Sequence, residues 1–172
     1  RFGDGDPPLP ERVQLWLERF AEAMRRPGRS LLNRYQVLGD LLSELGEVRS
    51  GVEKALKSRS PLQEYDDADS KLRDRWEDEL KAGVESEYRR VRTDFLNGLQ
   101  WFFRDVWFQA AGAGEGLLAL PQLGEATGEI AARASAADAS YNLEALNRAQ
   151  RRLETNLQES LVLEVALLRL RL

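Results

Sequence analysis

Residues 69–110 read DSKLRDRWEDELKAGVESEYRRVRTDFLNGLQWFFRDVWFQA, and this stretch decides the fold of the chain. Its apolar side chains recur in steps of three or four residues, the spacing of one face of an α-helix. This stripe consists of Leu72, Trp76, Leu80, Val84, Tyr88, Val91, Phe95, Leu99, Phe102 and Val106. The pattern predicts a single long helix from about Asp69 to about Ala110.

The two halves of this predicted helix differ in composition. Between Gln63 and Arg90, ten acidic and six basic side chains account for the whole net charge of −4. Acids precede bases by four residues at Asp67/Lys71, Asp69/Arg73, Glu77/Lys81 and Glu85/Arg89, a spacing that supports a helix. We therefore interpret the charged half as a solvated helix face rather than an acidic docking surface.

From Phe95 onward, apolar side chains surround the predicted helix axis. They are Phe95, Leu96, Leu99, Trp101, Phe102, Phe103, Val106, Trp107 and Phe108. A helix that is apolar all round must be buried on several sides, which predicts the centre of the core or a subunit interface. Arg104 and Asp105 lie within this segment, and a charge there must be paired or solvated.

Helical spacing extends over most of the remaining chain. Residues 1–10 hold two glycines and three prolines and predict a linker. A helix is expected from Glu11 to Pro27-Gly28, and another from the N-cap Ser30 to Gly46, followed by a shorter helix with Val48, Val52 and Leu56. Gly112, Gly114 and Gly116 predict a loop. Further helices are expected over Pro121–Arg133 and Ala139–Asn156, the latter with Leu143, Leu146, Ala149 and Leu153, and finally over the stripe Leu157, Leu161, Val165, Leu168 and Leu172.

No segment shows convincing period-2 alternation, so the predicted fold class is all-α, a bundle of about five to seven helices that includes one long helix. A length of 172 residues suits one domain, assigned to residues 11–172. Because the chain begins at Arg1 rather than Met, we expect it to be part of a longer protein.

The composition argues against several chemistries. The chain has no Cys and no His, which removes the usual zinc ligands, disulfides and His-assisted nucleophiles. An enzyme is therefore not expected, and no catalytic, cofactor or metal residue is assigned. Glu125 and Glu129 lie one turn apart and offer two ligands to a hard cation, but a solvated helix face is favoured. The Gly112–Gly116 glycines follow a helix and lack a P-loop ending.

An acidic net charge gives no general attraction to phosphate or anionic lipid. Direct DNA contact would require a local basic patch, for which the candidates are Arg89, Arg90, Arg92, Arg148, Arg151 and Arg152, but acids are interleaved with them. The apolar run Leu161–Leu172 is short and interrupted by charges, and no apolar signal segment opens the chain. We expect a cytoplasmic protein with no membrane contact.

The order of the last segments resembles a known family. Trp101-Phe-Phe-Arg104-Asp105-Val-Trp-Phe is followed by a glycine loop, by Arg151-Arg152-Leu153-Glu154, by Asn156, and by Leu161-Val-Leu-Glu164-Val-Ala-Leu167-Leu168-Arg-Leu170. Over roughly the last 80 residues this is similar to the C-terminal helical domain of bacterial DNA polymerase III clamp-loader subunits of the delta-prime and gamma/tau type. The family usually has Asn-Pro where this chain has Gln158-Glu159, and the charged segment from Gln63 to Arg90 looks longer than is typical.

The resemblance implies a non-catalytic oligomerisation, or collar, domain of a delta-prime-like subunit. Its partners would be the other subunits of a five-membered loader, with DNA reached only indirectly and no small-molecule substrate. ATP would be bound by an upstream AAA+ module outside this chain, so no cofactor is expected here. For packing the collar we select Trp101, Phe102, Arg104, Asp105 and Trp107, and for the last-helix seam Leu161, Leu168 and Leu170.

A second class of function stays open. A stand-alone helical bundle that recognises a partner helix through an apolar groove has the same composition. A full-length sequence distinguishes these two functions, because an upstream Gly-x-x-x-x-Gly-Lys-Ser/Thr motif or its remnant favours the loader subunit.

Overall fold

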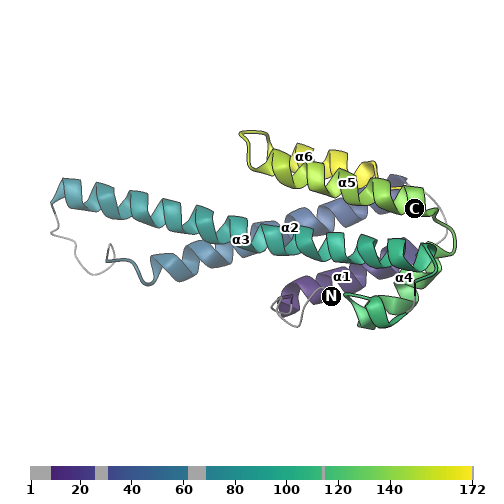
Figure 1. Cartoon of the computed structure of the whole chain (residues 1–172). Helices are drawn as coiled ribbons and strands as arrows, with labels where there is room; N and C mark the ends of the chain where they lie inside the picture. Colours follow the sequence, from purple (N-terminus) through teal and green to yellow (C-terminus); the bar gives the residue numbers. More distant parts are fainter. Residues whose placement is uncertain (1–8, 26–30, 62–68, 114, 172) are drawn as a thin grey trace. The chain divides into compact units, whose positions relative to one another are not determined.

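The computed structural model of the chain describes residues 9–25, 31–61, 69–113 and 115–171 (Figure 1). This described part contains six α-helices and no strand, which confirms the predicted all-α class. The helices are α1 (Glu11–Arg25), α2 (Leu31–Lys57), α3 (Ser70–Ala110), α4 (Gly124–Ala131), α5 (Ala136–Leu153) and α6 (Glu159–Leu168). Two short 3-10 helices, η2 (Glu115–Leu117) and η3 (Pro121–Leu123), lie between α3 and α4.

The described residues divide into two compact units. The first contains the residues up to Leu41 and from Asp94 onward, and the second contains Leu42–Thr93. Helices α2 and α3 contribute residues to both units. The assignment of residues 11–172 to one domain stays a prediction.

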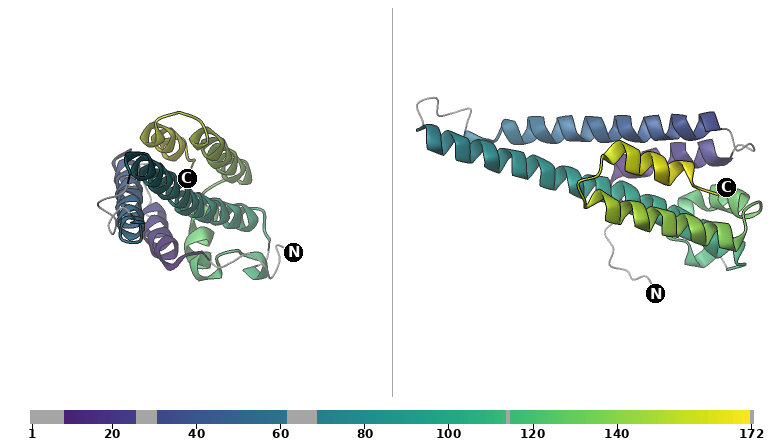
Figure 2. Two further views of the ribbon diagram at one scale, coloured as in Figure 1. Left: turned by 90° about the vertical axis from the view of Figure 1, so that its left-hand side faces the viewer. Right: turned by 90° about the horizontal axis from the view of Figure 1, so that it is seen from above.

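The first unit is built around the C-terminal part of α3. The α5–α6 pair lies on one side of this helix and α1 with α4 on another (Figures 1 and 2). The rings of Phe20 and Phe102 meet edge to face with centroids 5.3 Å apart, and Trp16 meets Phe95 at 5.6 Å in the same manner. These contacts, with buried Leu17 and Leu99, form the centre of the core.

Close approach between α1 and α3 depends on Gly98. A Cβ at this position would lie 2.8 Å from the Leu17 side chain and 3.1 Å from that of Val13. The absence of a side chain at Gly98 therefore lets α1 pack directly against the α3 backbone.

The second unit is an antiparallel pair formed by the end of α2 and the beginning of α3. Arg49 lies 3.3 Å from Glu85, and its guanidinium group stacks over the ring of Tyr88 at 5.1 Å. Leu56 meets the backbone of α3 at Gly83. The predicted Glu85–Arg89 pair forms at 2.9 Å, while Lys81 lies 3.8 Å from Asp78, one turn away. The charged half of α3 is thus a solvated helix face that carries short-range ion pairs.

The helix boundaries confirm most expectations and correct some. The long helix is α3, and the first helix is α1, as predicted. Helix α5 begins three residues earlier than expected because Ser135 caps it, accepting a 3.1 Å hydrogen bond from the Asp138 N–H, and it also ends three residues earlier, at Leu153. Residues 1–8 of the predicted linker 1–10, the Pro27-Gly28 stop, the Ser30 cap and Asp67 of the Asp67/Lys71 pair lie outside the described residues, while Leu9 at the end of that linker is buried.

The expected helix end at Gly46 is wrong. Helix α2 continues through Gly46 to Lys57, and no second helix begins at Val48. Gly46 is exposed, and a Cβ there would meet nothing within 4 Å. Leu45 and Val48 are buried on either side of it, so continued packing of the apolar stripe outweighs the low helix propensity of one glycine.

We expect the substitution Gly46→Ala to raise the free energy of unfolding by about 0.5–1 kcal/mol, because alanine costs less backbone entropy in a helix and the site has open space. The matched control is Gly112→Ala. Gly112 has φ +76° and ends α3 in a Schellman motif, with the Ala113 N–H bonded to the Phe108 carbonyl at 2.9 Å. Urea unfolding should show a loss of about 1 kcal/mol at Gly112. A loss at both positions would contradict a continuous α2.

Candidate interaction interface

The residues selected from the sequence lie at three different depths in the first unit. Phe102, Asp105 and Leu170 are buried, and Trp101, Arg104 and Leu168 are half-buried. Trp107 and Leu161 are exposed, at 40% and 54% of their surface. The structure therefore does not bring all of these residues to one surface. Within this chain the aromatic run is buried at Phe102 and Phe103 but not at Trp107, and its place in a subunit interface stays a prediction.

Asp105 fixes the loop that follows α3. Its carboxylate is fully buried and accepts hydrogen bonds from the N–H groups of Ala119 at 2.9 Å and Leu120 at 2.7 Å. Arg104 Nη1 lies 3.0 Å from the same carboxylate. Burial raises the pKa of Asp105, and the three donors oppose that shift. This carboxyl group thus binds its proton more tightly in the folded chain, and its contribution to stability decreases as pH rises through its pKa.

The Arg104 side chain contacts the loop and an aromatic ring next to the Asp105 carboxylate. Its guanidinium group donates to the Leu117 carbonyl at 3.2 Å and stacks over the Phe108 ring at 4.3 Å. The ring of Trp107 meets that of Phe108 edge to face at 5.5 Å. The requirement that the Arg104 charge be paired is met by Asp105, the loop carbonyl and the aromatic face.

Helix α6 carries apolar side chains on two opposite faces. One face packs into the first unit through Val162, Leu163, Ala166 and Leu167, all of which are buried. The other face, which we call the α6 outer face, consists of Leu161 and Val165, preceded by Leu157. Val165 is 38% exposed and Leu157 is 56% exposed. Leu161 and Val165 lie one turn apart and form an apolar strip on the helix surface, while Leu157 lies before the first turn of α6.

The beginning of α2 lies against α6. Arg34 Nη1 donates to the Leu168 carbonyl at 2.6 Å, next to the end of α6. Tyr35 Oη donates to Glu164 at 3.1 Å, and this bond is the main reason that the pKa of Tyr35 is raised. These contacts fix α6 against α2. Sequence reasoning missed them because they join residues about 130 positions apart.

A buried amide fixes the segment after α6. Asn142 Nδ2 donates to the Arg171 carbonyl at 2.7 Å, and Asn142 Oδ1 accepts from the Arg171 N–H at 2.7 Å. The sequence analysis placed Leu143 on the buried face of α5, but Asn142 is buried and Leu143 is half-buried. The spacing of Ala139, Asn142, Leu146, Ala149 and Leu153 could have revealed this register.

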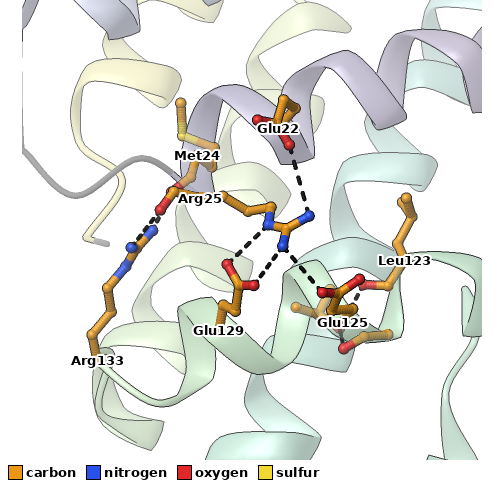
Figure 3. Close-up of polar contacts among 9 residues, drawn as sticks. Glu22, Met24, Arg25, Leu123, Glu125, Glu129 and Arg133 are labelled. Carbon is orange, nitrogen blue, oxygen red and sulfur yellow. Dashed lines mark hydrogen bonds and ion pairs between the residues drawn. The ribbon is translucent and has the colours of Figure 1, made fainter.

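The two glutamates that were considered as cation ligands form ion pairs with an arginine. The Arg25 guanidinium group lies 2.9 Å from Glu129 through Nε and 3.3 Å from Glu125, with Glu22 at 3.7 Å (Figure 3). In return, Arg133 of the segment after α4 donates to the carbonyls of Met24 and Arg25 at the end of α1. Both glutamates are exposed, which agrees with the preferred assignment to a solvated helix face, and this face of α4 also carries an ion-pair contact with α1. No cluster of three or more potential metal ligands occurs among the described side chains.

The Arg25–Glu129 contact predicts a pH-dependent contribution to stability. The hydrogen bond from Arg25 lowers the pKa of Glu129 below its ordinary value of 4.5. A carboxyl group with a lowered pKa contributes stability above that ordinary value and loses it as pH falls through the folded-state pKa. We expect Glu129→Gln to be less stable than wild type at pH 7 and to approach it in acid. Thermal unfolding from pH 7 to pH 3 measures this, with the exposed Glu18→Gln as control. Melting temperatures of wild type and Glu129→Gln that change with pH in the same way would contradict this contact.

The basic positions considered for DNA contact do not form one patch within a unit. Arg89 and Arg90 of the second unit pair with Glu85 and Glu87 on the same helix, and Arg92 is buried. Arg148 lies 3.7 Å from Glu144 in the first unit. Arg151 and Arg152 are exposed on the last turn of α5. Direct DNA contact gains no support from this arrangement.

No described helix is both long enough and apolar enough to cross a membrane. Comparisons with protein-family models, with curated proteins and with solved structures gave no match to this chain.

Proposed function

We propose that this chain is the non-catalytic oligomerisation domain of a delta-prime-like clamp-loader subunit, which associates with neighbouring subunits by helix packing. The α6 outer face carries the proposal. A helix that is apolar on two opposite faces needs two apolar neighbours, and the described residues of the first unit supply only one of them. The order of the Arg104-Asp105 helix, the Arg151-Arg152 helix and the final leucine-rich helix, on which the sequence resemblance rests, agrees with the proposal.

The proposed mechanism is positional. Helical domains that lie side by side would hold ATPase modules in a ring, so that nucleotide binding on those modules opens a sliding clamp and places it on DNA. In this chain, the Asp105 anchor and the contacts of Arg34 and Tyr35 keep α3, α6 and their loops rigid. A rigid surface loses less conformational entropy on association.

The test is light scattering on size-exclusion fractions of the chain, alone and mixed with the collar domains of the other clamp-loader subunits from the same organism. Wild type should elute with at least one of them as a defined complex. Leu161→Glu combined with Val165→Glu should abolish the complex, because charged groups would be buried in an apolar contact.

The matched control is Leu15→Glu, on α1, where the leucine is 50% exposed. This variant should keep the complex. A folded wild-type chain that associates with none of the collar domains would overturn the proposal and favour a stand-alone adaptor. Loss of the complex in all variants alike would show that the α6 outer face is not the contact.

A further inference from the structure

The α5–α6 pair carries a narrow groove of about 40 Å³ on its surface. Small side chains form its floor, with Ala145 and Ala149 from α5 and Ala166 from α6. All three alanines are buried, so they let α5 and α6 pack closely beneath the groove, and its accessible rim consists of the arginines and Val165. Small residues at a contact allow helix axes to come close together.

Every ionisable side chain that lines this groove is an arginine. They are Arg148, Arg152 and Arg169, in a chain whose net charge is −4. Arg152 and Arg169 are exposed, and neither side chain makes a hydrogen bond or ion pair with any residue that the structure describes. Arg148 lies 3.7 Å from Glu144 and stacks over the Tyr141 ring at 5.9 Å.

Arg169 also lines a second hollow, of about 380 Å³, next to the end of α6. Its other charged residues are Arg34 and Arg171, and none of the described side chains that line it is acidic. Arg171 lies 3.4 Å from Asp138 and stacks over the Tyr141 ring at 3.9 Å. The positive charge of the groove therefore extends along the surface toward the beginning of α2.

We propose that an acidic amphipathic helix of a neighbouring clamp-loader subunit lies across the groove. Apolar side chains of that helix would contact the exposed Val165 and Leu161, and its Asp or Glu side chains would pair with Arg152 and Arg169. This inference rests on the proposed function and adds the chemistry of the partner. Oppositely charged groups flanking an apolar contact favour one partner and one orientation over others.

Two other occupants fit the groove less well. A second copy in a two-fold contact would place arginines against the same arginines, and like charges in contact are costly. A nucleic-acid strand requires many cations that contact phosphates and a polar surface. Here Val165 lines the groove and Leu161 lies one turn before it, both exposed and apolar.

The experiment compares the double variant Arg152→Gln/Arg169→Gln with wild type, using the full chain and whichever collar domain associates with it. Binding is measured by titration calorimetry at about 50 mM and about 300 mM salt. The variant should bind at least about tenfold more weakly at low salt, and its affinity should depend less on salt than that of wild type. Both side chains are exposed, so circular dichroism should show unchanged folding.

The matched control is Arg59→Gln/Arg151→Gln, which removes the same charge from exposed arginines that do not line the groove. The control should bind within about twofold of wild type. Equal binding by wild type and the groove variant would overturn the inference and leave the proposed function standing. Failure of wild type to bind any collar domain would overturn the proposed function, and the inference with it.

Two further measurements test the other occupants. Wild type and the groove variant are titrated with a single-stranded 20-residue oligothymidylate, and their self-association is measured by light scattering. Neither should differ between the two proteins. Oligonucleotide binding, or a homodimer, that is lost in the groove variant while subunit binding is kept would overturn the inference in favour of that occupant.

Discussion

We expect Phe102→Ala to lower the free energy of unfolding by about 3–5 kcal/mol. Phe102 is fully buried, and its ring meets the rings of Phe20 and Phe103 edge to face, with centroids 5.3 Å and 5.4 Å away. Removal of the ring leaves a cavity between α1 and α3 that these neighbours cannot fill without leaving their rotamers. Urea unfolding followed by circular dichroism measures the loss.

The control for this prediction is Trp107→Ala, five residues further along α3. Its ring is 40% exposed, so less apolar surface returns to water and no closed cavity forms. We expect a loss of about 1–2 kcal/mol. Equal losses at the two positions would contradict the burial pattern of α3. The comparison also bears on assembly, because Phe102 is too deep to contact a neighbouring subunit and Trp107 is not.

We expect Asp105→Ala to lower the free energy of unfolding by about 3–4 kcal/mol. The substitution removes the acceptor of two hydrogen bonds, from the Ala119 N–H at 2.9 Å and from the Leu120 N–H at 2.7 Å. It also removes the charge that pairs with Arg104, whose side chain is only 18% exposed. The loop between α3 and α4 should become protease-sensitive, since this carboxylate holds it against α3.

Two variants make the Asp105 prediction specific. Asp78→Ala removes an exposed acid from the same helix and should cost less than about 0.5 kcal/mol. Asp105→Asn keeps one oxygen acceptor but turns an NH₂ group toward one of the two N–H donors, so its loss should be intermediate. An Asp105→Ala variant as stable as Asp78→Ala would show that the loop is held by other contacts.

The candidate interface was only partly predictable. The apolar stripe that reaches Leu161 and Val165 can be read from spacing alone. Spacing does not show which of these apolar residues face the interior, because α6 is apolar on two opposite faces and periodicity does not choose between them. The groove at Arg152 and Arg169 was likewise hidden, since these residues lie 17 positions apart and become neighbours only when α5 and α6 pair.

Some errors followed from local rules that packing overrode. Gly46 is a frequent kind of helix end, yet the neighbours Leu45 and Val48 are buried and carry α2 through it. Glu125 and Glu129 looked like an open acidic pair because Arg25 is about 100 residues away in the chain. The contact with Arg25 leaves no trace in the residues immediately around the two glutamates.

The sequence by itself determined the all-α class and the long helix α3, because apolar spacing over tens of residues is a local property that one helix satisfies alone. It also determined that Arg104 and Asp105 needed partners, since charges within an apolar segment cannot stay unsatisfied. Only the tertiary structure decided which groups bond to Arg104 and Asp105, which face of α6 remains exposed, and where the arginines of α5 and α6 lie close together. Those outcomes depend on contacts between residues distant in the chain, and a one-dimensional pattern does not specify such contacts.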